Sequence, residues 1–339
     1  MIDLKSLSEE EIFAFARDFD LPDYRGKQLL HWIYEKKVTD IAQISELSRE
    51  LRAKLSNKAF ISNLTLVVSE TSIDGTTKYL FELEDGKMIE SVFIPDDNRL
   101  TLCISSQAGC ALGCKFCVTG KTSFRRNLKA HEITDQVLSV SRIISPQRIT
   151  NVVFMGMGEP LLNLDNVLSA IKVINQYMKI SKRRITVSTA GIAPKIKDLA
   201  ADPPMVNLAI SLNASNDITR SLIMPINKRY NIKTLLDACR AFPLPKRRRI
   251  TFEYVLLKDI NDSTGDAEET ARLLNGIPSK INLIPLNEVQ GIKLERPDDS
   301  RVIAFQKKMI DKGLTAIIRK SKGSDISAAC GQLSGKHRK

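Results

Sequence analysis

The spacing of hydrophobic residues along the chain changes twice. Over the first 60 residues, hydrophobic positions recur every three or four residues, which is typical of helices that bury one face. Ser8 and Glu11 have the spacing of a capping box ahead of the first such stretch, and a third helix is expected over 45–58. We therefore predict a small helical accessory domain over residues 1–60.

The next segment follows the two-residue period of β-strands. Three stretches have this character: 64–68, 79–83 and 88–94. Asp-Gly pairs at 74–75 and 85–86 mark the turns between them, because such pairs favour tight hairpins. The pattern predicts a short antiparallel β extension over residues 61–95.

From residue 100 onward, short apolar runs alternate with longer amphipathic ones. The candidate strands are 101–105, 151–155, 184–189, 207–212, 250–257 and 281–285. The candidate helices are 131–144, 165–178, 194–200, 232–242, 266–275 and 300–312. Six strand–helix units in a row indicate an α/β fold with a parallel sheet covered by helices, and we assign it residues 96–323. In such folds the active site lies at the C-terminal ends of the strands.

Composition agrees with a folded globular protein. Hydrophobic residues make up 43% and charged residues 27% of the 339 positions, which excludes a disordered or fibrous chain. No apolar run approaches the roughly 20 residues that span a membrane. The acidic start of the chain lacks the pattern of a signal peptide, so we expect a cytoplasmic protein with no membrane partner.

The charge balance favours a polyanionic partner. Lysine and arginine number 51 against 39 acidic residues, which gives a net charge of +12. Basic clusters lie at 125–126, 182–184 and 246–249. Such clusters can neutralise phosphates, although a run of charge is more often a solvated surface. The basic residues 336–339 are expected to form a solvated tail.

The cysteines carry the most specific signal. Cys110, Cys114 and Cys117 form a C-x3-C-x2-C pattern in a loop just after the first strand of the α/β region. Three thiolates can hold three corners of an iron–sulfur cubane, whereas a cluster closed by protein alone takes four cysteines. One iron then keeps an open position for a ligand. The alternative is a structural zinc loop in a non-catalytic RNA-binding protein, although zinc loops usually pair C-x2-C units or add histidines.

This loop resembles that of the radical S-adenosylmethionine (SAM) superfamily. The resemblance implies a partial (β/α)6 barrel, one [4Fe-4S] cluster held by three cysteines, and SAM bound to the open iron. Further motifs lie at 103–107, 154–160, 211–213, 224–227 and 323–333. Together they resemble the RlmN family of RNA adenine-C2 methyltransferases, over nearly the whole chain. The sister family, Cfr, methylates C8 of the same adenine, and Pro160 favours RlmN.

The RlmN resemblance implies a reaction on RNA. Its substrates are an adenosine in the peptidyl-transferase region of 23S rRNA and the adenosine beside the anticodon in some tRNAs. Adenine C2 is electrophilic and does not attack a sulfonium methyl group, so a radical is needed. Two SAM molecules are used per turnover, together with an S-methylcysteine intermediate, a transient disulfide and an electron donor such as flavodoxin or ferredoxin. We expect a monomer.

The same resemblance assigns three catalytic roles. Cys330, in the C-terminal segment 324–339, carries the methyl group, and Cys103 resolves the RNA adduct by forming a disulfide. Glu90 accepts the proton from adenine C2. Thiolates are competent for both sulfur reactions. Taken singly, Cys103 is also compatible with a core position on a strand, and Glu90 with an exposed carboxylate on an edge strand. Cys239 lies on an apolar helix face and is expected to serve packing.

The SAM contacts carried over from the family are Gly158, Glu159, Ser188, Ser211, Leu212, Asn213 and Asn287. Most of them stand at predicted strand ends. The glycine lets backbone approach a ligand, and the carboxylate of Glu159 can pair with the methionine ammonium group. Ser188 and Asn213 can reach the ribose, and Leu212 contributes its backbone. Each position is also compatible with ordinary strand-end structure.

Overall fold

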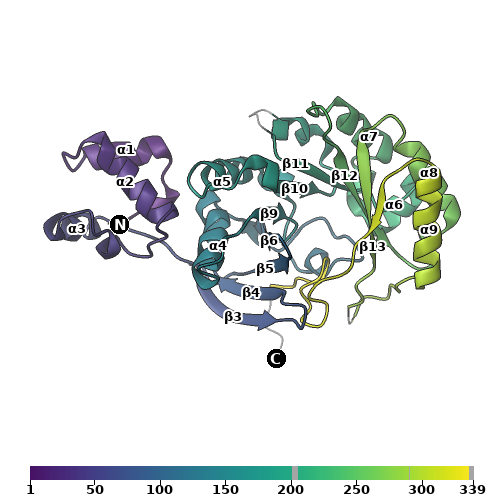
Figure 1. Ribbon diagram of the computed structural model, residues 1–339, viewed down its shortest axis with the longest axis horizontal. Helices are drawn as coiled ribbons and strands as arrows, with labels where there is room; N and C mark the ends of the chain where they lie inside the picture. The colour runs from purple at the N-terminus through teal and green to yellow at the C-terminus, as the bar shows by residue number, and fades with distance from the viewer. Residues whose placement is uncertain (201–204, 290, 336–339) are drawn as a thin grey trace.

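The computed structural model describes residues 1–200, 205–289 and 291–335. A ten-stranded sheet forms its centre, in the order β14-β13-β12-β11-β10-β9-β6-β5-β4-β3 (Figure 1). Neighbouring strands from β6 to β14 are parallel: β6 (Arg99–Cys103), β9 (Asn151–Phe154), β10 (Ile185–Thr189), β11 (Asn207–Ser211), β12 (Ile250–Leu256), β13 (Ser279–Pro285) and β14 (Ala316–Ile318). The antiparallel extension consists of β5 (Met88–Asp96), β4 (Thr77–Glu82) and β3 (Thr65–Thr71).

Helices cover the outer face of the parallel strands, as the alternating pattern predicted. They are α4 (Ala130–Ile143), α5 (Leu164–Gln176), α6 (Asp217–Ile223), α7 (Ile232–Ala241), α8 (Thr264–Leu273) and α9 (Asp299–Asp311). The main hydrophobic core lies between these helices and the sheet, where Leu102, Val187 and Ile281 are fully buried. Burying such a side chain contributes about 2 kcal/mol. The open, partial barrel confirms the predicted fold class.

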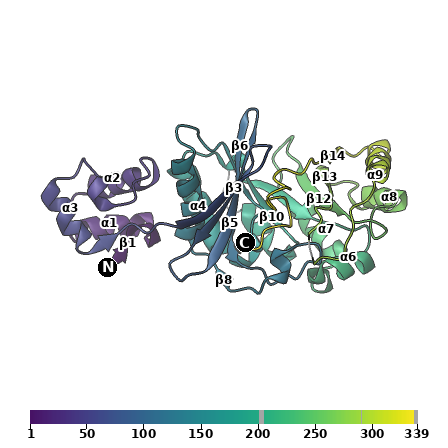
Figure 2. The same ribbon diagram turned by 90° about the horizontal axis from the view of Figure 1, so that it is seen from below.

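The N-terminal helices form a body of their own at one end of the elongated molecule (Figures 1 and 2). They are α1 (Glu9–Arg17), α2 (Asp23–Tyr34) and α3 (Arg49–Ser56), and the Ser8–Glu11 capping box is present. A second hydrophobic core lies among them. A short pair, β1 (Ile2–Asp3) with β2 (Ala59–Phe60), closes this part. The buried Lys5 amine lies 2.6 Å from an Asp135 carboxylate oxygen on α4 and so joins it to the barrel.

The structure differs from the prediction at three elements. Residues 194–200 form two 3-10 turns, Ala193–Lys195 and Lys197–Ala200, instead of a helix, because the segment is short and Pro194 removes a backbone donor. The seventh parallel strand, β14, was not predicted, since three residues are too few to show a period. Helix α6 was also missed. The predicted basic tail at 336–339 lies outside the described residues.

After β14 the chain returns across the barrel to the β extension (Figure 1). It is fastened there by side chains of β4 and the turn before it. Ser72 donates to Asp325 over 2.6 Å, and Lys78 donates to the carbonyl of Ile326 over 2.7 Å. This return path brings the C-terminal segment up to the ends of the barrel strands.

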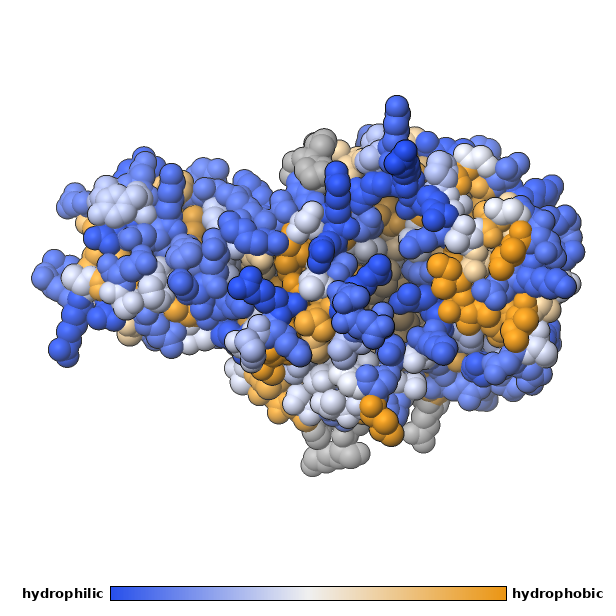
Figure 3. All heavy atoms as spheres, in the orientation of Figure 1, coloured by the Kyte–Doolittle hydropathy of each residue, from blue (hydrophilic) through white to orange (hydrophobic). Residues whose placement is uncertain are grey.

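One face of the molecule is mostly hydrophilic (Figure 3). Figure 3 shows polar and charged residues over most of one face, with hydrophobic side chains gathered in smaller patches. In the described part of the chain, no helix combines the length and apolar character needed to cross a membrane.

Candidate active site

The cysteine loop begins just after β7 (Gln107–Ala108), which pairs with β8 (Arg126–Asn127). Gly109 opens the loop with φ +79°, and a Cβ there would lie 2.3 Å from the carbonyl oxygen of Ser123. Only glycine fits such a position. The loop is fixed on its other side because the Lys115 backbone N–H donates to the carbonyl of Ile223 over 2.9 Å.

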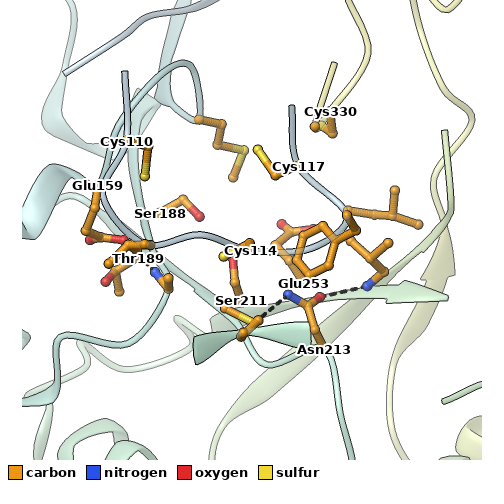
Figure 4. Close-up of a pocket in the computed structure, with 18 of the residues that line it drawn as sticks. Cys110, Cys114, Cys117, Glu159, Ser188, Thr189, Ser211, Asn213, Glu253 and Cys330 are labelled. Carbon is orange, nitrogen blue, oxygen red and sulfur yellow. Dashed lines mark hydrogen bonds between the residues drawn. The ribbon is translucent and has the colours of Figure 1, made fainter. Parts of the chain in front are cut away.

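A cavity of about 180 Å³ lies at the C-terminal ends of the barrel strands. Cys110, Cys114, Cys117 and Cys330 all line it, and Figure 4 shows these thiols around one space together with polar residues of the strand ends. The structure thus brings the predicted cluster loop and the C-terminal cysteine together, although more than 200 residues separate them in the sequence.

The thiols of the loop suit a cluster bound by three cysteines. Burial raises the pKa of Cys110 to about 11 and also raises the pKa of Cys114, and the negative charges of neighbouring thiolates act in the same direction. Metal binding to such thiols displaces their protons, so cluster assembly is linked to proton release. In the described part of the chain, no three His, Cys, Asp or Glu side chains stand close enough together to hold a metal ion as they are placed here, so the fit of the loop rests on its three thiol donors and not on their present spacing.

Glu159 lies on the cavity wall near Cys110 (Figure 4) and is 3% exposed. Its two carboxylate oxygens accept hydrogen bonds from the backbone N–H groups of Leu161, over 3.1 Å, and Ala190, over 2.7 Å. Burial nevertheless raises its pKa to about 6. The carboxylate is therefore fixed in direction and retains lone pairs for a ligand cation.

Gly158 also lines the cavity, but its neighbour explains the residue type. It has φ +97°, and a Cβ would lie 2.4 Å from the Cβ of Gln107. Packing against β7 therefore requires glycine here. Gln107 in turn accepts from the Glu159 backbone N–H over 2.8 Å, which holds the Gly-Glu turn against the cysteine loop.

The other predicted SAM contacts divide into two groups. Ser188, Ser211 and Asn213 line the cavity at the ends of β10 and β11. Asn213 has φ +60° and accepts from the Val255 backbone N–H over 2.8 Å, so its amide is oriented. Leu212 does not line the cavity: its side chain is buried in the main core, and its carbonyl accepts from Arg220 over 2.9 Å.

Asn287 links the cavity to the C-terminal segment. It lines the cavity after β13, and its amide donates to the carbonyl of Cys330 over 3.1 Å, while Ser321 donates to its amide oxygen. The Val118 backbone N–H donates to the carbonyl of Gly331 over 2.7 Å. Cys330 is thus held between the cysteine loop and the end of β13. The residue as a whole is exposed, while burial of its thiol in the cavity raises the pKa to about 11.

Cys103 lies behind the cavity wall at the end of β6. It is 8% exposed and packs with Val92, Met157 and Ala328. Burial raises its pKa to about 12, and the charge of Cys330 contributes in the same direction. Its packing with Ala328 places it against the C-terminal segment two residues before Cys330. Cys239, by contrast, is buried on α7 in the main core, as predicted.

Glu90 lies on β5 beneath the C-terminal segment and is 1% exposed. Its carboxylate accepts from the backbone N–H groups of Ser334, over 2.6 Å, and Gly335, over 3.0 Å. The Lys78 amine is 3.8 Å away. Burial outweighs these contacts and raises the pKa of Glu90. Because Glu90 is buried, the alternative of an exposed carboxylate on an edge strand is wrong. Its side chain does not line the cavity in this structure.

Two residues of the site were not predicted. Glu253 on β12 lines the cavity, accepts from Asn282 over 2.9 Å and has a pKa raised by burial. A carboxylate inside the apolar run 250–257 was the available signal. Arg220 on α6 is fully buried, and it donates to the carbonyls of Leu212 and Ala190, the latter over 2.7 Å. No pattern in the sequence marks it.

Arg220 fixes the strand ends behind the cysteine loop. It also donates to the Ser211 carbonyl over 3.0 Å and to Asn227 over 2.9 Å. Burial lowers its pKa to about 10, and the charge of Cys114 opposes that shift. A buried cation thus lies in the electrostatic field of the loop that supplies anionic ligands.

Known proteins share this arrangement. The family model described as the radical SAM superfamily matches residues 104–274. A solved structure of a radical SAM methyltransferase from Sphaerobacter thermophilus superposes with a TM-score of 0.95 at 40% identity, covering 99% of this chain and 100% of that one. The barrel and its three-cysteine cavity are those of a radical SAM enzyme, a class that carries a [4Fe-4S] cluster and uses SAM.

Comparison over the full length narrows the class. The model described as the ribosomal RNA large subunit methyltransferase N-terminal domain matches residues 2–61. The dual-specificity RNA methyltransferase RlmN of Pelobacter propionicus is 50% identical over 336 residues, covering 98% of this chain and 96% of the relative. That of Geobacter sulfurreducens is 50% identical over 338 residues, covering 99% and 93%. The chain belongs to the RlmN family of RNA methyltransferases.

Proposed function

We propose that this enzyme methylates C2 of adenosine in 23S rRNA and in some tRNAs, with Cys330 as methyl carrier and Cys103 as the resolving thiol. One observation carries the assignment: Cys330 lines the same cavity as the three cysteines of the loop, and Cys103 packs with Ala328, two residues before Cys330. This arrangement suits a reaction in which one sulfur receives the methyl group and a second releases the product.

Cys110, Cys114 and Cys117 hold the cluster, and SAM binds beside it between Glu159 and the ends of β10 and β11. When bound, the cluster and SAM supply a methyl group for Cys330 and a radical that activates the S-methyl group. The Glu159 carboxylate pairs with the ligand ammonium, and Ser188, Ser211 and Asn213 offer hydroxyl and amide groups to its polar parts. Gly158 shapes the turn, and Leu212 acts through its backbone. Asn287 holds the carrier segment.

The release step balances with these two cysteines. The Cys103 thiolate attacks the sulfur of Cys330, the S–S bond forms, and the S–C bond to the RNA methylene group breaks. The electron pair leaves on that carbon, which takes up a proton to become the methyl group. The disulfide then needs two electrons from a donor of the flavodoxin or ferredoxin class before the next turnover.

Glu90 serves as the acceptor of the adenine C2 proton. Burial raises its pKa, and a raised pKa suits a carboxylate that must hold a proton. Because its carboxylate is engaged by Ser334 and Gly335, this role requires the end of the C-terminal segment to move when RNA binds.

The parts of the chain divide the work. Residues 1–60 and 61–95 are accessory parts, residues 96–323 form the catalytic barrel, and residues 324–339 form the carrier segment. The enzyme acts in the cytoplasm as a monomer.

The decisive test replaces Cys330. We expect Cys330→Ala, reconstituted anaerobically with iron and sulfide, to lose RNA methylation completely while keeping the visible absorption of the cluster. Cys239→Ala is the matched control, because it removes a thiol from the core of the barrel and should retain activity. Mass spectrometry of digested RNA reads out 2-methyladenosine. Normal methylation by Cys330→Ala would overturn the carrier assignment, and 8-methyladenosine in its place would indicate the Cfr reaction.

A further inference from the structure

The barrel has a second hollow at the N-terminal ends of its strands. Its volume is about 550 Å³, within the usual range of ligand sites. The residues lining it are Asn98, Arg99, Asn151, Arg183, Arg184, Thr186, Asn207, Arg248, Arg249, Thr251 and Lys280. Six of these eleven carry a positive charge and none is acidic.

The hollow is the opposite mouth of the same barrel. Thr251 lines it, whereas Glu253 and Val255, on the same face of β12, line the cysteine cavity. Thr186 and Ser188 divide in the same way along β10. At about 3.3 Å per residue, the four steps from Thr251 to Val255 separate the two sites by about 13 Å.

Two basic clusters that are distant in the sequence meet here. Arg183 and Arg184 precede β10, and Arg248 and Arg249 precede β12, so the parallel strands carry both pairs to one edge. The third basic cluster, 125–126, does not contribute to the hollow. Its Arg126 instead forms ion pairs with Asp85 and Glu132, at 2.7 Å each. Chain topology thus concentrates positive charge at this mouth.

Among the described residues, the arginines of the hollow have no carboxylate partner. Within the described ranges, Arg99, Arg183 and Arg184 are exposed and have no carboxylate within ion-pair distance. Arg248 donates only to neutral groups, the carbonyl of Met205 over 2.7 Å and the Asn207 amide oxygen. Burial, and to a smaller extent the charge of Arg183, lowers the pKa of Arg248. Like charges held together in a concave site attract an anion from solution.

We propose that this hollow is a second RNA-contact site, which binds phosphodiester groups of the substrate remote from the adenine that enters the cysteine cavity. The hydroxyl groups of Thr186 and Thr251 line it and can donate to phosphate oxygens, while the exposed arginines form its rim. The volume suits several phosphates rather than one. The inference rests on RNA as the substrate, which the family supports, and not on the roles of the individual cysteines.

The test removes the rim charges and measures RNA binding as a function of salt. Arg99→Gln/Arg183→Gln/Arg184→Gln takes away three cations whose side chains make no hydrogen bond within the described structure. Arg240→Gln/Arg272→Gln/Lys312→Gln is the matched control, because it removes the same charge from exposed ion pairs on the helical layer. Both are prepared with the cluster and titrated with tRNA and a 23S rRNA fragment between 50 and 300 mM salt.

We expect the rim variant to lose about 100-fold in RNA affinity in 0.1 M salt, and the slope of log K against log salt to fall by about 2, since each lost contact with single-stranded phosphate removes about 0.7. In the control, the slope of log K against log salt should stay within about 0.7 of the parent value, which corresponds to one phosphate contact. Equal losses in both variants would show an effect of net charge and overturn the site. Tripolyphosphate binding that is lost in the rim variant while RNA affinity stays unchanged would also overturn it.

The result is separable from the methylation mechanism. RNA-independent SAM cleavage by the reduced enzyme reports on the cysteine cavity alone, and the rim variant should retain it. If methylation chemistry failed in every form while RNA binding still depended on the rim arginines, the RNA-contact site would stand and the catalytic assignment would not.

Discussion

The two mouths of the barrel are lined by the same strands, yet their polar side chains are held differently. At the C-terminal mouth, Glu159, Asn213 and Asn287 are each fixed by hydrogen bonds to backbone groups. At the N-terminal mouth, exposed arginines such as Arg183 and Arg184 face solvent. Bond-making requires fixed geometry, whereas attraction of a phosphate chain requires mainly charge. The difference predicts that variants at the first mouth change chemistry and that variants at the second change RNA affinity.

The largest effect that separates the mouths is expected from Cys103→Ala. Without the resolving thiol, the S–C bond to RNA cannot be broken by disulfide formation, so turnover should stop with RNA attached to the protein. A slowly migrating, nuclease-sensitive species on a denaturing gel is the measurement. RNA affinity should change less than twofold, because Cys103 is buried behind the cavity wall.

Cys239→Ala again provides the control, since it should release methylated RNA without an adduct. Release of methylated RNA by Cys103→Ala at the parent rate would show that another group resolves the adduct. Cys330 would then be the only cysteine outside the loop that assigns the chemistry to the C-terminal mouth.

A smaller effect is expected from Arg220→Met, which tests how the C-terminal mouth is fixed. The change leaves the buried carbonyls of Leu212, Ala190 and Ser211 without their donor. At roughly 1 kcal/mol for each, the free energy of unfolding should fall by about 3 kcal/mol. Urea unfolding of the protein without cluster measures this, and Arg220→Lys should lose less because it keeps the buried charge.

Iron content after reconstitution provides a second readout for Arg220. If the strand ends and the cysteine loop depend on this residue, Arg220→Met should hold less iron per chain than Arg220→Lys. Equal stability of the two variants and the parent enzyme would show that the carbonyls find other partners, and that the C-terminal mouth is less rigid than the contacts of Arg220 imply.

The sequence predicted the elements of the fold better than it predicted the contacts within the site. The six strands from β6 to β13 and most helices follow from periodicity, because each buries a whole face. The cysteine loop was recognisable since Cys110, Cys114 and Cys117 are close in sequence. Arg220 could not be found in this way: its partners are backbone carbonyls, which any sequence supplies. The meeting of Arg183 with Arg248 depends on strand order, which the spacing of hydrophobic residues does not state.

The smallest effect concerns the pH dependence of SAM binding at the C-terminal mouth. Burial raises the pKa of Glu159 to about 6, above the usual value of 4.5, so this group favours the folded state below pH 4.5, and that contribution is lost as the pH rises through 6. SAM affinity depends on pH in the opposite direction from folding stability: it rises with pH, because the SAM ammonium group requires the ionised carboxylate. With a pKa of about 6, the ionised fraction falls about fourfold from pH 7.5 to 5.5, and SAM affinity should fall by the same factor.

Equilibrium dialysis with the reconstituted enzyme measures this change. Glu159→Gln should bind SAM weakly and with no such slope, while Glu253→Gln, which alters the other carboxylate of the cavity wall, should keep the slope. RNA affinity at the arginine-lined mouth should stay constant over this range, because guanidinium groups do not titrate there. A slope that survived Glu159→Gln and vanished with Glu253→Gln would move the ammonium site across the cavity to β12.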